Sequence, residues 1–357
     1  MDQGTAENIY HGYLKYTGRK ILIILLTFLL SVVLGVYAVN AGSADLSPAQ
    51  VLLTLLGEGD ERLNVIIWNI RLPRIAAAFI AGIGLSVAGC VMQNLLQNPL
   101  ASPSTLGVSQ GAAFGAAVAI IALGAGSLQS TSADAVVINS PYLVSAAAFM
   151  GAMLTTITVL MLARLRGVTP EAMILAGVAV GSLFSAATVV LQYFASDVQV
   201  ASLVFWTFGD IGRASWGEIK IMAFVVGIFF LYFMANRWNY NAVDGGEETA
   251  KSLGVNVERI RILGMFGASL ITAVIVSFLG IISFIGLLGP QIMRRLLGGD
   301  HRFLIPASAV MGGFLLLASD TIARTIIAPV VLPVGAVTSF MGAPLFLYLL
   351  TRGNSRR

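Results

Sequence analysis

Residues 21–39 read ILIILLTFLLSVVLGVYAV and contain no charged side chain. A helix needs roughly 20 apolar residues to cross the hydrocarbon core of a bilayer. The run follows Lys15, Arg19 and Lys20, as the core of a secretory signal peptide would, and residues 38–41 (AVNA) could be its cleavage site. However, the run is longer than the usual core of a signal, and more apolar runs follow it. We therefore interpret it as an uncleaved first transmembrane helix.

The rest of the chain has the composition of a membrane protein. Of its 357 residues, 57% are hydrophobic and only 11% are charged, whereas soluble domains carry about 25% charged residues. The apolar runs are too long and unbroken for barrel strands, which show as alternating segments of roughly 10 residues. Nine further helices are predicted at about 74–97, 104–125, 142–164, 172–195, 217–235, 261–284, 287–297, 302–325 and 335–351. The sequence thus predicts one all-α polytopic membrane domain over residues 1–357, with ten transmembrane helices.

Basic residues are divided unequally between the two sides of this topology. With the N-terminus in the cytoplasm, fifteen of the 21 lysine and arginine residues fall inside and six fall outside. The six outer residues are Arg62, Arg71, Arg74, Arg213, Lys220 and Arg324. This is the usual bias of short loops, and it explains the net charge of +4 without a nucleic-acid partner. We predict a cytoplasmic (inner) membrane location, with some 20 N-terminal residues and both termini in the cytoplasm.

Few residues are candidates for chemistry. Cys90 has no second cysteine, and His11 and His301 lie far apart, so no metal site is predicted. Residues 245–252 (GGEETAKS) come close to a phosphate-binding loop, but Ala250 stands where the motif requires glycine. We predict that the chain is not an enzyme and binds no cofactor, and that any ATP and Mg²⁺ belong to a partner polypeptide.

Asp320 and Arg324 are the main ionisable pair within a predicted span. Their spacing of four places both on one helix face. They could carry a proton in a secondary transporter of a small polar solute, because ionisable residues in spans often serve ion pathways. They could equally form a local salt bridge near the outer interface. The scarcity of other charges in the spans favours the salt bridge.

Two polar breaks interrupt the apolar pattern on the cytoplasmic side. Residues 93–107 contain two prolines and several amides, which fit either an ordinary loop or a constriction at the cytoplasmic mouth. Residues 239–261 form the longest cytoplasmic connection. In it, Glu247 and Lys251 are spaced for a short surface helix, and apolar Leu253 lies among the charges. The connection is either a solvated loop or a docking surface for a soluble partner.

Several motifs follow one another in a recognisable order. They are Arg71–Arg74, Asn98–Pro103, Ala250–Gly254, Phe284–Leu287 with Gly289–Pro290, Asp300–Arg302, Leu332–Gly335 and Gly342–Pro344. In this order the chain, from about Asp45 to Arg352, resembles the FecCD family. These proteins are the permeases of type II ATP-binding cassette (ABC) importers for ferric siderophores, haem and cobalamin. The order and spacing of the motifs, rather than any single one, carry the resemblance.

The resemblance implies the type II importer permease fold and a set of partners. The permease would form a homodimer in the lipid bilayer, with two ATPase subunits below and one extracytoplasmic substrate-binding protein above. The implied cargo is an iron–siderophore, haem or cobalamin-like chelate, and an oxyanion such as molybdate is an alternative. Two positions depart from the family pattern. Gln291 stands where histidine is usual, and Val331 stands where glutamate is frequent.

The resemblance also implies roles for individual residues. Binding-protein docking would involve Arg71, Arg74 and Arg324. The cytoplasmic gate would involve Asn98, Pro99, Leu100 and Thr169. Coupling to the ATPase would use residues within 239–261, namely Gly246, Glu247, Glu248, Ala250, Lys251, Leu253 and Gly254.

Overall fold

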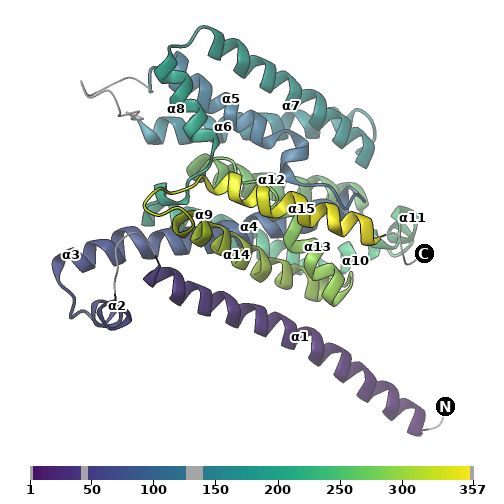
Figure 1. The fold of residues 1–357 in the computed structure, drawn as a ribbon. Coiled ribbons are helices and arrows are strands. Elements are labelled where there is room, and N and C mark those ends of the chain that lie inside the picture. Colours follow the sequence, from purple (N-terminus) through teal and green to yellow (C-terminus); the bar gives the residue numbers. More distant parts are fainter. Residues whose placement is uncertain (1–2, 42–46, 126–139, 354–357) are drawn as a thin grey trace.

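The computed structural model describes residues 3–41, 47–125 and 140–353. Over these residues the chain is built from helices, and no strand occurs among them. Most of the long helices run along one common direction, so that their ends gather at two opposite faces of the bundle (Figure 1). The prediction of an all-α polytopic protein is confirmed.

Each of the ten predicted helices has a counterpart in the described parts of the chain. They are α1 (Gln3–Asn40), α4 (Leu72–Leu95), α5 (Val108–Ala117), α6 (Pro141–Arg164), α7 (Pro170–Tyr193), α9 (Trp216–Ala235), α12 (Val257–Leu279), α13 (Ile285–Leu297), α14 (His301–Thr325) and α15 (Val334–Gly353). Seven of the helices in these parts are long and apolar enough to cross a membrane. The apolar helices Val108–Ala122 and Val334–Tyr348 are shorter.

The second predicted helix begins much earlier than expected. The short helix α3 (Glu61–Asn64), the π-helix η1 (Val65–Arg71) and α4 form one continuous helix of 35 residues, Glu61–Leu95. Arg71 and Arg74 therefore lie inside a helix, and the predicted helix start at about residue 74 is wrong. Pro73 favours a helix start at this point because it lacks an N–H and crowds the preceding turn. The wider π turn accommodates it, since the Leu72 N–H bonds to the Ile67 carbonyl five residues back.

Other helices lie where the sequence indicated loops. They are α2 (Pro48–Leu55), α8 (Asp197–Thr207), α10 (Arg237–Asp244) and α11 (Glu247–Ser252), of which only α11 was foreseen as a possibility. Helix α8 carries a recognisable start signal, because Ser196 and Gln199 form a reciprocal capping box. Helix α1 also extends back to Gln3, far beyond its apolar run. Polar residues such as Lys15 end a membrane crossing without ending a helix, because lysine and arginine are good helix formers.

Small residues set the close spacing of the helices, as in other membrane bundles. Gly111 and Gly115 of α5 face Gly151 and Ala147 of α6, and a Cβ atom on Gly115 would collide with the Ala147 carbonyl. The bundle is layered: α5 to α8 lie on one side, α4, α9 and α12 to α15 in the middle, and α1 on the other side (Figure 1). The central helix α4 contacts α9, α12, α13 and α14.

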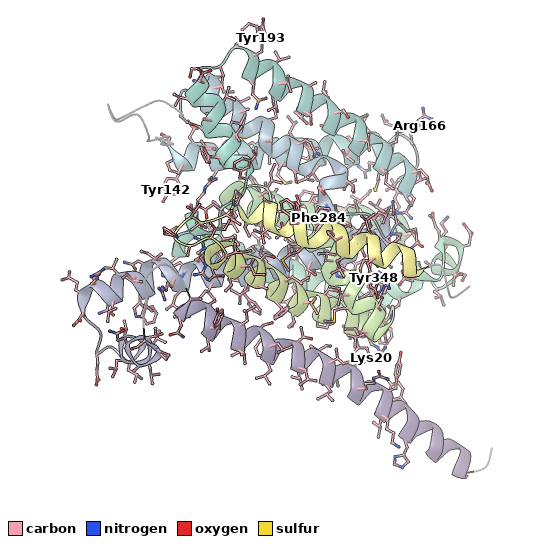
Figure 2. All side chains as sticks on the ribbon, in the orientation of Figure 1. Lys20, Tyr142, Arg166, Tyr193, Phe284 and Tyr348 are labelled. Atoms are coloured by element: carbon pink, nitrogen blue, oxygen red, sulfur yellow. The ribbon has the colours of Figure 1, made fainter. Side chains whose placement is uncertain are left out.

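The two ends of the bundle differ in what they carry. Helices α10 and α11, the beginning of α1 and the last turn of α15 lie toward one end of the bundle (Figure 1). Arg166 and Lys20, predicted to be cytoplasmic, lie toward that end, whereas Tyr142 lies toward the opposite end (Figure 2). We refer to the end with α10 and α11 as the inner end, and to the opposite one, with α2 and α3, as the outer end.

Candidate functional sites at the two ends of the bundle

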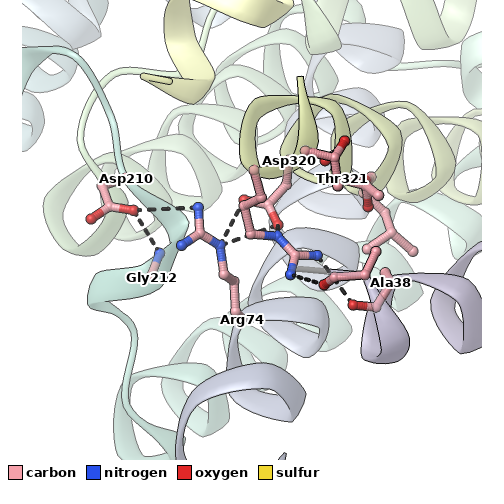
Figure 3. A network of polar contacts seen from close by, with 10 residues as sticks. Ala38, Arg74, Asp210, Gly212, Asp320 and Thr321 are labelled. Carbon is pink, nitrogen blue, oxygen red and sulfur yellow. Dashed lines mark hydrogen bonds and ion pairs between the residues drawn. The ribbon is translucent and has the colours of Figure 1, made fainter. Parts of the chain in front are cut away.

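The outer end contains a buried carboxylate shared by two arginines. The Asp320 side chain is fully buried in α14. Arg74 Nε of α4 lies 2.9 Å from Asp320 Oδ1, and Arg324 Nε lies 3.0 Å from Asp320 Oδ2 (Figure 3). The expected salt bridge between Asp320 and Arg324 is confirmed, and Arg74 joins it from 246 residues away. A buried charge is tolerated only when it is paired and hydrogen-bonded, and this cluster satisfies that condition.

Two more elements are tied to this cluster. Arg324 also donates to the carbonyls of Ala38 and Ala41 at the end of α1, where helix carbonyls lack partners in their own helix. Asp210 lies 3.8 Å from Arg74 Nη2 and accepts a hydrogen bond from the Gly212 N–H (Figure 3). The cluster therefore connects α1, α4, α14 and the segment after α8.

The three predicted docking arginines meet at the outer end, but they are not free surface groups. Arg71 is 5% exposed and donates to the carbonyls of Val39 and Asn40. Arg324 is 8% exposed and bonded as described above. The Arg74 side chain is 13% exposed and borders a cavity of about 350 Å³, whose lining includes Asp210, Arg213 and Val331. Of these three, Arg74 is the best placed to meet a partner at that end.

At the inner end, the predicted gate residues Asn98, Pro99 and Leu100 form a tight turn after α4. Asn98 Oδ1 accepts a hydrogen bond of 2.9 Å from the Leu100 N–H, and the Leu100 side chain is 40% exposed. Gln291 Nε2 of α13 donates to the Pro99 carbonyl at 2.9 Å and to Gln93 Oε1 at 3.2 Å. Gln291, which stands where the family usually has histidine, thus contacts the turn of the predicted gate residues. The sequence did not indicate this contact.

Thr169, the fourth predicted gate residue, lies in a second turn at the inner end. It caps α7, because its hydroxyl oxygen accepts a hydrogen bond from the Ala172 N–H. Gly167 and Val168 before it both have positive φ, 78° and 55°. This conformation is uncommon for a β-branched residue such as Val168. We call residues 97–101 the first gate turn and residues 167–169 the second gate turn.

The predicted coupling residues occupy α11 and its flanks. Gly246 and Gly254, with φ of 104° and 80°, bound the helix at positions that favour glycine. Ala250 is fully buried against Val243 and Val257, so it anchors the helix and contributes no surface.

The exposed side of α11 carries charge and one apolar side chain. Lys251 Nζ lies 3.2 Å from carboxylate oxygens of both Glu247 and Glu248, and the short helix that the Glu247–Lys251 spacing predicts is present as α11. Leu253 is 68% exposed. The pKa of Glu247 is lowered, mainly because Arg261 donates a hydrogen bond to its carboxylate. Glu247 is therefore ionised at neutral pH.

A further polar cluster fastens α10 to its neighbours. Asn94 of α4 donates to Asp244 Oδ1 at 2.6 Å, and the His301 N–H donates to Asn241 Oδ1 at 2.8 Å. Asp300, the N-cap of α14, accepts hydrogen bonds from the Arg302 side chain. Burial alone would raise the pKa of Asp300, but the bonds from Arg302 and Asn241 outweigh it and lower the pKa to about 2.

Sequence analysis missed several residues of these sites. Asp210, Asn94 and Arg261 are the clearest, because each acts through partners far away in the sequence. In the described residues no group of three or more His, Cys, Asp or Glu side chains is arranged to hold a metal ion. The segment that approaches a phosphate-binding loop is largely the helix α11.

Long apolar spans packed through small residues, with charged clusters at the two ends, define a polytopic membrane protein. Residues 26–352 match the FecCD transport family, and the chain belongs to that family. The chain is 57% identical to a Methanocaldococcus jannaschii protein described as an ABC transporter permease, over 97% of this chain and 98% of the relative. It is 36% identical to an Fe(3+)-citrate import system permease of Bacillus subtilis, over 93% and 95% of the two chains.

A solved structure is also similar. It is described as an inward-facing conformation of a metal-chelate type ABC transporter. The similarity covers 92% of this chain and 99% of the solved one, with a TM-score of 0.80 and 28% sequence identity. The resemblance found in the sequence motifs is therefore confirmed at the level of family and fold.

Proposed function

We propose that this chain is the permease subunit of an ATP-driven ABC importer that moves a metal chelate into the cytoplasm. The observation that carries the proposal is the FecCD match over residues 26–352, which includes both gate turns and α11. The chelate class is a ferric siderophore, haem or cobalamin-like compound. It is supported by the iron-citrate permease among the relatives and by the metal-chelate transporter among solved structures.

The ATPase is a separate polypeptide in this proposal, and the chain itself holds no cofactor. Two ATPase subunits, with their ATP and Mg²⁺, dock at the inner end against α11. The exposed Leu253 and the charged Glu248 and Lys251 supply the apolar contact and the polar rim that protein interfaces combine. Both termini then lie in the cytoplasm.

A second copy of the chain and an extracytoplasmic binding protein complete the importer. Helices α7 and α15 present large apolar side chains that are exposed; Tyr193 of α7 is 83% exposed and Phe340 of α15 is 82% exposed. Tyr193 lies on the outside of the bundle (Figure 2). These faces would pack against the second copy. At the outer end, Arg74 would pair with an acidic group of the binding protein, while Arg71 and Arg324 hold the local structure through their bonds to α1.

The test begins with affinity purification of the tagged chain from its native membrane in mild detergent, followed by mass spectrometry. We expect a Walker-motif ATPase and a bilobal binding protein to co-purify. The recovered complex is then placed in proteoliposomes, and uptake of labelled ferric citrate, a ferric hydroxamate, haem, cobalamin and molybdate is measured with and without ATP.

ATP-dependent uptake of one of the chelates supports the proposal. ATP-dependent uptake of molybdate and of none of the chelates would show that the cargo is an oxyanion, and the assignment to ABC importers would stand. Uptake without an ATPase that collapses when a protonophore is added would contradict the proposal and indicate a proton-coupled carrier.

A further inference from the structure

Arg261 occupies an unusual position for an arginine at the inner end of a membrane protein. It lies in the first turns of α12, close to the cytoplasmic side, yet it is only 3% exposed. Long basic side chains near the ends of membrane helices normally extend to water. A buried guanidinium is stable only when its donors are matched by acceptors. The acceptors of Arg261 therefore show which parts of the chain this side chain connects.

The three nitrogens of the Arg261 guanidinium bond to three different parts of the chain. Nε donates to the Leu95 carbonyl at 3.2 Å, and Nη1 donates to the Val168 carbonyl at 2.6 Å. Nη2 lies 3.1 Å from Glu247 Oε2. These partners are 166, 93 and 14 residues away along the sequence. One side chain thus bonds to three segments that lie far apart in the sequence.

Each partner belongs to a functional element of the inner end. Leu95 is the last residue of α4 and leads directly into the first gate turn. Val168 belongs to the second gate turn and precedes the cap residue Thr169. Glu247 is the first residue of α11, the helix that we assign to ATPase coupling. Arg261 therefore bonds at once to the end of α4 just before the first gate turn, to the second gate turn and to the coupling helix.

The three bonds of Arg261 differ in how buried their partners are, and this difference indicates where a movement would enter. Those to Leu95 and Val168 are buried and involve backbone carbonyls. The bond to Glu247 reaches a side chain that is 43% exposed and lies on the surface available to a partner. The guanidinium is planar, and its donors form a rigid fork. A shift of Glu247 therefore turns the whole guanidinium, including the nitrogens that donate to the Leu95 and Val168 carbonyls. A displacement of α11 thus reaches the end of α4 and the second gate turn through the Arg261 side chain.

We propose that Arg261 is the positioning residue that transmits movement of α11 to both cytoplasmic gate turns of its own subunit. The proposal rests on the importer function proposed above. Other bonds near α10 reach only the first gate turn or the end of α4; for example, Gln97 donates to the Val243 carbonyl and Asn94 to Asp244. Among the contacts of the described residues, those of Arg261 join the end of α4 and the second gate turn to the coupling helix.

The experiment uses the complete complex, with its ATPase and binding protein, in proteoliposomes. Arg261→Gln removes the fork, and Glu247→Gln removes the exposed carboxylate while leaving both buried bonds in place. Exposed residues at the same end supply matched controls, Arg164→Gln and Glu171→Gln. ATP hydrolysis and uptake are measured together, so that the readout is the number of chelates transported per ATP. Thermal unfolding and complex yield are recorded for every variant.

For Arg261→Gln we expect ATP hydrolysis per folded complex to stay within about twofold of the unaltered protein. Glu247 lies on the surface assigned to the ATPase, so Glu247→Gln is judged by transport per ATP hydrolysed and not by its rate of hydrolysis. Uptake should fall at least tenfold, so transport per ATP falls with it. The control variants Arg164→Gln and Glu171→Gln should transport as many chelates per ATP as the unaltered protein. A purely structural role would lower the yield of folded complex but leave transport per ATP unchanged, and Glu247→Gln serves as the variant that still folds.

The outcomes separate the two proposals. If the unaltered complex transports with ATP and the variants keep its ratio of transport to hydrolysis, the role of Arg261 is overturned while the importer function stands. If the unaltered complex shows no ATP-dependent uptake, the importer function itself fails, and the role of Arg261 fails with it.

Discussion

Asp320 shows what a single residue can reveal in a nearly uncharged bundle. Its pairing with Arg324 follows from a spacing of four on one helix, but its bond to Arg74 depends on the packing of α4 against α14. Two arginines share the buried Asp320 carboxylate, and the partly exposed Asp210, 3.8 Å from Arg74, supplies the second negative charge of the cluster. Arg74 and Arg324, predicted from the sequence as docking groups, are thereby also structural groups.

This sharing predicts a large effect of Asp320→Asn. The neutral side chain leaves two largely buried arginines without their counter-charge, and breaking a buried pair typically costs about 3–5 kcal/mol. We expect a marked drop in the apparent melting temperature in detergent. Asp210→Asn is the control, because its carboxylate is 45% exposed and 3.8 Å from Arg74, and an exposed pair contributes about 0–1 kcal/mol. Equal melting temperatures for the two variants would contradict the buried cluster.

A second residue-scale prediction concerns pH and Asp300. Its pKa is lowered to about 2 in the folded protein, against about 3.9 in an unfolded chain. A depressed pKa gives a stabilisation that is complete above the unfolded value and is lost as the pH falls through the folded one. The melting-temperature difference between the unaltered protein and Asp300→Asn should be constant above about pH 5 and shrink as the pH falls toward 2. A difference that grows on acidification would refute the assigned bonds.

At the scale of elements, the apolar runs located the helices well and their ends poorly. The bilayer requires long apolar helices, and this requirement is visible in the sequence. Helix ends depend on local geometry that the runs do not report. The π turn before Pro73 and the cap of α8 at Ser196 are examples, and only the second has a sequence signal. The helix spacing likewise depends on which small residues face each other.

Two glycines test the packing of elements. Gly115→Ala places a methyl group against the Ala147 carbonyl of α6, whereas the added atom at Gly227 of α9 meets nothing within 4 Å. Overpacking typically costs about 1–3 kcal/mol, and alanine is favoured over glycine in a helix by about 1 kcal/mol. We therefore expect a lower melting temperature for Gly115→Ala and an equal or higher one for Gly227→Ala. The reverse order would show that α5 and α6 do not approach as described.

At the scale of the whole molecule, the two ends of the bundle meet different partners in the proposed importer: the binding protein at the outer end and the ATPase at the inner end. The outer end carries the cluster around Asp320 beside a cavity, and the inner end carries both gate turns and α11. The bias of basic residues predicts which end faces the cytoplasm. That orientation can be measured directly.

Single cysteines and a membrane-impermeant maleimide supply the measurement. In a Cys90→Ala background, Arg62→Cys should be labelled in intact cells or spheroplasts. Lys251→Cys should be labelled only after the membrane is opened. The unaltered chain is the control, because its one cysteine is fully buried and should remain unlabelled. Labelling of Lys251→Cys in sealed cells, with Arg62→Cys protected, would reverse the orientation.

The apolar pattern of the sequence is enough to predict an all-α polytopic membrane protein, and its motifs resemble the FecCD family, to which the chain belongs. It could do so because the bilayer imposes length and apolarity on each helix separately, and each helix is a local stretch of sequence. The pairing of Arg74 with Asp320 could be found only in the folded bundle, as could the bonds by which Arg261 links the end of α4, the second gate turn and α11. Those bonds join residues far apart in the chain, and their existence depends on which helix faces pack together.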